Sequence, residues 1–221
     1  RDLVRSRGLG DVYKRQDFAR LMSDYFVKYL AGQKGSGSNT MKTYRDTFVQ
    51  LLEFMDEKKH IRADCIEVDS FSYDIINEFL EYLEKEKRVS ISTRNNRLAA
   101  IRSFFKYTGY HEPKYLNIST SIREISKKKT EGRQMNYLSV NAMEHFLNSF
   151  DKTDHKELRC FCIVLLLYES GARVTELCNV RRYDLHLEKP YTMILHGKGD
   201  KIRSVPLDGL VAVSYTHLTL P

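Results

Sequence analysis

The sequence predicts a mainly α-helical protein of two domains, with a small antiparallel β-hairpin in the second domain. Three observations support this prediction. Four segments between residues 17 and 106 repeat apolar residues with the 3.6-residue period of an amphipathic helix. The apolar pattern then fades into a basic stretch between residues 110 and 137. Beyond it, two strand-like runs flank the sequence Gly197-Lys198-Gly199.

Composition sets limits on the class of partner. The 221 residues are 42% hydrophobic and contain no run of 18 apolar residues, so we expect a soluble chain with no membrane partner. Residues 1–16 and 213–221 resemble translated sequencing adapter, and we expect both tails to be non-native; a native basic arm is the alternative. Residues 1–16 hold five basic and two acidic side chains, so the net charge of +7 becomes +4 without them. Such a charge is only weak evidence for a polyanionic partner, and the positions of the charges matter more.

The cysteines show no metal-ligand spacing. They are Cys65, Cys160, Cys162 and Cys178. We expect reduced thiols in the protein core, which are typical of a cytoplasmic protein, and neither a metal nor another cofactor.

The first two helices are predicted on either side of a flexible loop. The first runs from Asp17 to near Gly32, and residues 35–38 form the Gly- and Ser-rich loop. The second helix carries Lys42 and Arg45 in its first turn, where cations oppose the helix dipole. A nearby phosphate would remove that conflict, and an ordinary solvated face is the alternative.

The third and fourth helices follow the same apolar period. The third is predicted from Asp69 to Lys87, and the fourth begins with Ser92 as its N-cap. No acidic residue lies between Arg88 and His111. The polar donors expected on the surface of the fourth helix are Arg94, Asn95, Arg97, Arg102 and Lys106. A helix face with several donors and no opposing charge is typical of an element that binds a phosphate backbone.

A basic segment separates the two predicted domains. We expect a DNA-binding helical domain over residues 17–115, a linker over 116–136 and a second domain over 137–212. The linker lysines Lys127–Lys129 either contact phosphates or are solvated. In the second domain Ser139 is expected to cap a helix, and the unbroken apolar run Phe161–Tyr168 predicts a buried one.

The end of that buried helix brings together residues suited to phosphate chemistry. Gly171 breaks the helix, and Arg173 begins a second helix with Glu176 one turn on. The planar fork of an arginine can bind two phosphate oxygens at once. Lys198 lies at the tip of the predicted hairpin. A structural Arg–Glu ion pair and a solvated hairpin lysine are the alternatives for these residues taken singly.

These stretches resemble a known family. The run Gly-Ala-Arg-Val-Thr-Glu-Leu from Gly171, followed by Lys-Gly-Asp-Lys-Ile-Arg-Ser-Val-Pro-Leu from Lys198, resembles the start of the catalytic domain of the tyrosine recombinases, the phage integrase family. The four helices resemble its N-terminal SAM-like core-binding domain, whose second and fourth helices meet DNA. The resemblance covers Asp17 to Leu210, and it implies an α+β fold for the second domain.

The resemblance implies roles for particular residues. Arg173 and Lys198 correspond to catalytic residues and Glu176 to a supporting acidic position. In the family a tyrosine attacks duplex DNA and forms a 3′-phosphotyrosyl link, without metal or nucleotide, in a tetramer on paired sites. The family's His-x-x-Arg box and nucleophilic tyrosine lie C-terminal to the hairpin, so we expect a C-terminally truncated chain that binds DNA without cleaving it. Tyr13, Tyr215 and His217 lie in the adapter-like tails and are not assigned.

The sequence also allows other functions. A non-catalytic helical DNA-binding or recombination accessory protein would explain the basic fourth helix but not the joint occurrence of Arg173 and Lys198. A type IB topoisomerase or telomere resolvase shares the catalytic plan, although the helical N-terminal domain disfavours a topoisomerase. A helical interaction protein would show no salt-dependent binding to DNA. The sequence does not distinguish a phage integrase, a transposon recombinase and a chromosome-dimer resolvase.

Overall fold

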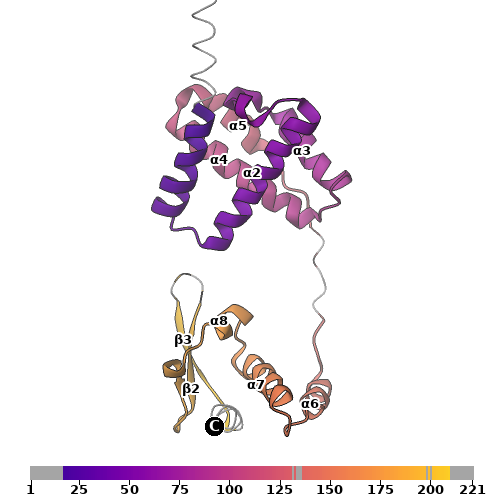
Figure 1. The fold of residues 1–221 in the computed structure, drawn as a ribbon, viewed down its shortest axis with the longest axis vertical. Coiled ribbons are helices and arrows are strands. Elements are labelled where there is room, and N and C mark those ends of the chain that lie inside the picture. Colours follow the sequence, from indigo (N-terminus) through magenta and orange to yellow (C-terminus); the bar gives the residue numbers. More distant parts are fainter. Residues whose placement is uncertain (1–16, 131, 133–135, 198, 200, 210–221) are drawn as a thin grey trace, which may run out of the picture. The chain divides into compact units, whose positions relative to one another are not determined.

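The computed structural model describes residues 17–130, 132, 136–197, 199 and 201–209. They divide into two compact units, an N-terminal unit up to residue 133 and a C-terminal unit from residue 134 (Figure 1). Helices form most of the N-terminal unit, whereas the described part of the C-terminal unit combines helices with the described strands. The mainly α fold with a small antiparallel sheet, predicted from the sequence, is confirmed.

The N-terminal unit consists of helices joined by short turns. Residues 17–24 form an α-helix that continues directly into the π-helix η1 (Tyr25–Gln33). The other helices are α2 (Ser38–Lys59), α3 (Tyr73–Lys85), α4 (Ile91–His111) and α5 (Leu116–Glu124), and the 3₁₀ turns are η2 (Ala63–Cys65), η3 (Val68–Ser70) and η4 (Pro113–Tyr115). The first four helical segments are those predicted from apolar periodicity. Helix α5 lies in the segment that the sequence predicts as linker.

Serine side chains begin two of these helices. The Ser72 hydroxyl accepts a hydrogen bond from the Ile75 N–H at the start of α3, and the Ser90 hydroxyl accepts one from the Thr93 N–H at the start of α4, both at 3.2 Å. The prediction that Ser92 caps the fourth helix is therefore wrong. Ser90 takes this position because its extended backbone places its hydroxyl beside the N–H three residues on.

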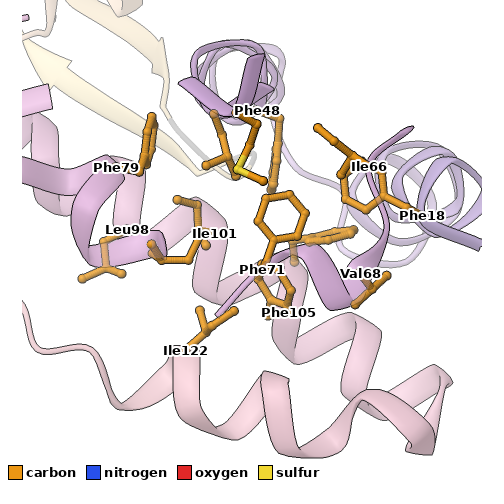
Figure 2. Close-up of a cluster of buried hydrophobic side chains, with 14 of the residues drawn as sticks. Phe18, Phe48, Ile66, Val68, Phe71, Phe79, Leu98, Ile101, Phe105 and Ile122 are labelled. Carbon is orange, nitrogen blue, oxygen red and sulfur yellow. The ribbon is translucent and has the colours of Figure 1, made fainter. Parts of the chain in front are cut away.

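Apolar side chains from all helices of the N-terminal unit meet in one core (Figure 2). The Phe104 ring on α4 lies at its centre, with ring centroids 5.2–6.0 Å from those of Phe18, Tyr25, Phe48 and Phe105. All four pairs are close to edge-to-face, and each such pair stabilises a fold by about 0.5–1.5 kcal/mol beyond its burial. Helix α4 therefore organises the packing of this unit.

Helix α5 packs closely against α4. Its Ile122 and the following Ile125 are fully or almost fully buried in the core. At the contact, a Cβ atom at Gly109 would lie 2.6 Å from the Ser119 Cβ atom, so only glycine permits this approach of the two helices. The start of the predicted linker thus belongs to the core, because the two isoleucines are spaced to face the same side.

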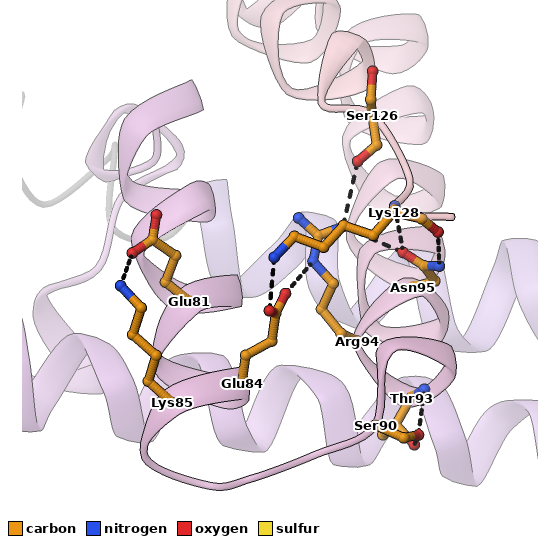
Figure 3. Close-up of polar contacts among 9 residues, drawn as sticks. All are labelled: Glu81, Glu84, Lys85, Ser90, Thr93, Arg94, Asn95, Ser126 and Lys128. Atoms are coloured by element: carbon orange, nitrogen blue, oxygen red, sulfur yellow. Dashed lines mark hydrogen bonds and ion pairs between the residues drawn. The ribbon is translucent and has the colours of Figure 1, made fainter. Parts of the chain in front are cut away.

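The chain that leaves α5 stays on the N-terminal unit as far as Lys128 (Figure 3). The Asn95 side-chain amide donates to the Lys128 carbonyl at 2.8 Å and accepts from the Lys128 N–H at 3.1 Å. Arg94 Nη1 donates to the Ser126 carbonyl at 3.3 Å. Glu84 forms ion pairs with Arg94 at 3.0 Å and with Lys128 at 2.7 Å. We call Glu84, Arg94, Asn95 and Lys128 the linker clamp.

The described part of the C-terminal unit combines α-helices with a small sheet. Its elements are α6 (Val140–Asn148), α7 (His155–Ser170), α8 (Val174–Cys178), the 3₁₀ turn η5 (Arg182–Asp184), β1 (Leu185–His186), β2 (Thr192–His196) and β3 (Ile202–Pro206). The strands are antiparallel in the order β1-β2-β3. The Ser139 hydroxyl accepts from the Ala142 N–H at 3.2 Å, so the predicted cap of α6 is confirmed. The predicted hairpin is formed by β2 and β3.

Helix α7 is buried on one face only. Its buried residues are Phe161, Cys162, Leu165, Leu166 and Ser170. Ile163 and Tyr168 are 41% and 52% exposed, so the prediction that this apolar run forms a buried helix holds for one face of α7 and fails for the other. All four cysteines are free, but Cys162 alone is buried, and the expectation of core thiols fails for the others. Burial raises the pKa of the Cys162 thiol.

The linker clamp predicts a change in protease sensitivity. Replacing Asn95 by Ala removes both hydrogen bonds to Lys128, each worth about 1 kcal/mol in a typical protein. We expect trypsin to cleave after Lys127–Lys129 roughly tenfold faster or more, because cleavage follows the population of the released segment. Mass spectrometry of timed digests measures the rate at each site.

The neighbouring, exposed Asn96 provides the matched control, since no hydrogen bond from its side chain occurs among the described residues. Cleavage in Asn96→Ala should proceed at the wild-type rate. Equal rates in the Asn95 and Asn96 variants would show that the clamp does not hold the segment.

Candidate active site

Arg173 lies at the junction between α7 and α8. Gly171 ends α7 in the left-handed conformation (φ +56°), which favours glycine, and its N–H donates to the Leu167 carbonyl at 3.1 Å. The buried Ser170 hydroxyl accepts from the Ala172 N–H at 3.2 Å and steadies the turn. Arg173 is then the extended N-cap residue of α8. The predicted position of Arg173 at the start of a second helix is confirmed.

Glu176 holds Arg173 through two contacts. Its Oε2 atom accepts from the Arg173 N–H at 3.1 Å, and its Oε1 atom accepts from Arg173 Nη1 at 2.7 Å. The Glu176 side chain is only 6% exposed, whereas that of Arg173 is 73% exposed. The carboxylate therefore anchors one side of the guanidinium group and leaves the other side open to an anion.

A second arginine shares the same carboxylate. Arg203 on β3 donates from Nη2 to Glu176 Oε2 at 2.9 Å and to the Gly171 carbonyl at 3.2 Å. This residue was missed by the sequence analysis. The alternation of side chains along β3 could have identified it. Arg203 lies on the same face of the strand as Val205, which is half-buried, and Leu207, which is buried. Ile202, on the opposite face, is 65% exposed. An arginine on the strand face that carries buried residues is well placed to reach an acidic partner, although the Arg203 side chain itself stays 47% exposed.

These contacts keep Glu176 ionised. The Arg173 N–H holds the pKa of the Glu176 carboxyl below its ordinary value of 4.5, the Arg173 guanidinium adds to this effect, and burial opposes it. The charge of Arg203 lowers the pKa further. At neutral pH the cluster thus carries two positive charges and one negative charge.

The base of the β2–β3 connection lies beside Glu176. A Cβ atom at Gly197 would stand 3.3 Å from Glu176 Oε1, and the Gly197 N–H donates to the Lys201 carbonyl at 2.8 Å. Gly199 has φ +75°, as expected for a residue in the turn. Lys198, the second predicted catalytic residue, lies outside the described residues.

Three of the predicted DNA-binding residues contact other parts of the N-terminal unit. Arg94 is only 5% exposed, so the expectation that it lies on the surface is wrong. Its partner Glu84 comes from α3, which an inspection of the fourth helix alone could not show. Asn95 binds the Lys128 backbone, and Arg97 Nη1 donates to the Thr43 carbonyl at 3.1 Å.

The remaining predicted cations are unengaged in the part of the chain that is described. No hydrogen bond or ion pair there involves the side chains of Lys42, Arg45, Arg102 or Lys106. Lys42, Arg45 and Lys106 are exposed, and Arg102 is half-buried. Lys42 and Arg45 are neighbours on α2 at a spacing of three residues, and Arg102 and Lys106 are neighbours on α4 at a spacing of four.

The described residues offer neither a metal centre nor a membrane-spanning helix. No group of three or more His, Cys, Asp and Glu side chains there is arranged to hold a metal ion. None of the helices in that part of the chain is long and apolar enough to cross a membrane.

Comparison with known proteins assigns the family. The model of the phage integrase N-terminal SAM-like domain matches residues 24–113, and that of the phage integrase family matches residues 136–219. The tyrosine recombinase XerD of Listeria innocua is 30% identical over 189 residues. The chain belongs to the tyrosine recombinase family. The XerD match covers 83% of this chain and 59% of XerD.

A further relative agrees with this assignment, and two solved structures share the fold. The integrase/recombinase y4rD of Sinorhizobium fredii is 29% identical over 201 residues, which are 90% of this chain and 72% of y4rD. A crystal structure of the site-specific recombinase XerH bound to a palindromic difH substrate has a TM-score of 0.61 at 24% identity, over 87% of this chain and 55% of that one. The Tn1549 transposon integrase has a TM-score of 0.62 at 17% identity, over 88% of this chain and 63% of the integrase chain. At these identities the two structures show the fold.

The lowered pKa of Glu176 predicts how acid affects the C-terminal unit. Its stabilising ion pairs are complete above pH 4.5 and are lost as pH falls through the lower folded-state pKa, because the unfolded chain takes up the proton first. We expect Glu176→Gln to lower the unfolding midpoint at pH 7 and to reduce the further loss between pH 7 and pH 3.5. The NMR signals of β2 and β3, followed on heating, report this midpoint.

Glu188→Gln, at an exposed position of the same unit, serves as the control and should follow the wild-type pH profile. An identical acid-induced loss in wild type and Glu176→Gln would contradict the role given to this carboxylate.

Proposed function

We propose that the chain is part of a site-specific DNA recombinase that cleaves and rejoins duplex DNA through a 3′-phosphotyrosyl intermediate. The observation that carries this proposal is the exposed guanidinium of Arg173, which is anchored on the buried Glu176 and faces solvent with its other side. A planar donor held in this way is suited to bind the non-bridging oxygens of a phosphodiester. The family membership supports the reaction type.

The proposed chemistry needs one nucleophile and one proton donor. A tyrosine hydroxyl releases its proton to solvent and its oxygen attacks the phosphorus atom. The bond to the 5′ oxygen breaks, so the phosphate stays on the enzyme as a 3′-phosphotyrosyl ester. Arg173 offsets the negative charge that builds on the non-bridging oxygens, and Lys198 donates the proton that the leaving 5′ oxygen needs. Because the ester keeps the energy of the broken bond, a 5′-hydroxyl can reseal the strand without a nucleotide.

The remaining catalytic residues are proposed to lie in a longer form of the protein. The His-x-x-Arg box and the nucleophilic tyrosine of the family follow the hairpin, and this chain spans 59% of XerD and 72% of y4rD. We expect the 221-residue chain to bind duplex DNA without forming a covalent adduct. A phosphotyrosyl adduct between this chain and nicked DNA would contradict that expectation.

The DNA surface that we propose lies on two helices of the N-terminal unit. It comprises Lys42 and Arg45 on α2 together with Arg102 and Lys106 on α4, whose side chains are unengaged within the described residues. We leave Arg94, Asn95 and Arg97 out of this surface because they hold the fold and the linker segment. Solved relatives include XerH bound to a difH substrate and the Tn1549 integrase in complex with transposon right end DNA. We propose a tetramer on paired sites as the working assembly.

The decisive test is to sequence the source DNA beyond the hairpin, with a primer placed at codons 197–201. A frame that continues into a His-x-x-Arg box and a tyrosine would support the catalytic function. A natural stop near residue 213 would contradict it and would favour the alternative, a non-catalytic DNA-binding or recombination accessory protein.

Salt dependence tests the proposed DNA surface. Each phosphate contact contributes about 0.9 to the slope of log affinity against log salt. We expect Arg102→Gln and Lys106→Gln each to reduce this slope by about one unit, measured by fluorescence anisotropy with a labelled duplex. Lys85, which is paired with Glu81 on α3, provides the control, and Lys85→Gln should leave the slope unchanged. Unchanged slopes in both test variants would place the DNA elsewhere.

The role of Arg173 can be tested in a form that carries the nucleophile. Arg173→Lys keeps the charge but loses the planar fork, so we expect strand cleavage to slow by about 10² to 10³. A suicide substrate that traps the covalent intermediate measures the rate. DNA affinity measured in parallel should stay within about threefold of wild type, because a lysine at position 173 keeps the positive charge there and the N-terminal unit is unchanged. Cleavage near the wild-type rate would remove Arg173 from the catalytic site.

A further inference from the structure

Arg203 occupies a strand position that normally belongs to an apolar residue. Along β3 the side chains at 203, 205 and 207 share one face, and Leu207 is buried in the core of the C-terminal unit. Arg203 pairs across the sheet with Leu195, which is fully buried. The arginine therefore extends from the inward face of the sheet toward the end of α7 and the start of α8.

One nitrogen of Arg203 joins three elements. Nη2 donates to the Gly171 carbonyl at 3.2 Å, just after the end of α7, and to Glu176 Oε2 at 2.9 Å, within α8. The same Oε2 atom accepts the Arg173 N–H at 3.1 Å. Arg203 and the backbone of Arg173 are thus held by a single carboxylate oxygen. A shift of β3 would move this oxygen and with it the start of α8.

The charges in the cluster favour an anionic ligand. Glu176 alone would neutralise Arg173, and a neutral pair attracts a phosphate poorly. With Arg203 the cluster carries one net positive charge, and the exposed side of Arg173 keeps donors that Glu176 does not occupy. Arg203 itself is turned toward Gly171 and Glu176, so its contribution to ligand binding acts through Arg173.

We propose that Arg203 is a positioning residue of the candidate active site, which fixes strand β3 against α8 through Glu176 and so holds Arg173 ready for a phosphate. This inference rests on the proposed recombinase function. Arg203 also joins the β2–β3 hairpin to the helix that carries Glu176, so both sides of the site move together. Gly197 supports the arrangement, since any larger residue would press on Glu176 Oε1.

The test measures Arg173 directly by NMR on the 221-residue chain. In Arg203→Ala we expect hydrogen exchange of the Arg173 amide to accelerate about tenfold, since its acceptor loses a charged partner. The carboxyl ¹³C titration of Glu176 should move upward toward pH 4.5. Arg203→Lys restores the charge and should rescue both signals in large part, which a general packing defect would not show. Lys156→Ala, an exposed site on α7, is the control and should match wild type.

A second variant decides the outcome if Arg203→Ala unfolds the C-terminal unit. Gly197→Ala keeps every charge but places a methyl group 3.3 Å from Glu176 Oε1, so the Arg173 amide should again exchange faster. Arg173 exchange within twofold of wild type in a folded Arg203→Ala would overturn the proposal, as would an unchanged rate in Gly197→Ala if the first variant is unfolded. DNA takes no part in these measurements. A wild-type chain that fails to bind duplex DNA would contradict the proposed function and leave the positioning role intact.

Discussion

The candidate site depends on one buried carboxylate. Glu176 accepts hydrogen bonds from the Arg173 N–H, from the Arg173 guanidinium and from Arg203, and these donors come from residues 30 positions apart in the chain. Two guanidinium groups in the same place would repel each other without a negative charge between them. Burying an unpaired carboxylate costs free energy, so a buried carboxylate is stable only when it is fully hydrogen-bonded. Because Glu176 is bonded in this way, it is a rigid anchor for its partners. The orientation of Arg173 is thus set by a residue that does not itself face solvent.

The N-terminal unit uses an acidic residue in a similar way but to a different end. Glu84 also binds two cations, Arg94 and Lys128, which lie on α4 and on the segment after α5. The difference is exposure, since the Arg94 side chain is 6% exposed and the Arg173 side chain 73%. A buried arginine has its donors committed to the fold, whereas an exposed one that is anchored on one side keeps donors for a ligand. The same type of ion pair therefore holds the fold in one unit and, on the proposed function, orients a phosphate-binding group in the other.

The sequence predicted features that depend on neighbouring residues in the chain and missed those that depend on a partner from another element. Apolar periodicity located the four helices, because burial of one face is a local property of a helix. The spacing of Gly171, Arg173 and Glu176 likewise predicted a local turn correctly, and the Arg–Glu ion pair that was the alternative interpretation of these residues is present. The burial of Arg94 was not predictable in the same way, because its partner comes from another helix, and the absence of acidic residues within α4 said nothing about α3. Arg203 was within reach of strand alternation but needed its partner Glu176 to be recognised.

The number of unengaged cations among the described residues would limit the affinity with which the N-terminal unit binds DNA on the proposed function. Of the seven polar residues predicted to contact DNA, three are engaged within the unit and four are unengaged in the described residues. Four phosphate contacts correspond to a salt slope of about 4, well below that of proteins that bind tightly through many contacts. Such a unit would hold a duplex weakly and would depend on the C-terminal unit for a stable complex. On the proposed function, a phosphate bound by Arg173 would add one contact to these four, and a lysine at position 173 would keep the charge of that contact while losing the two-oxygen grip that the reaction needs.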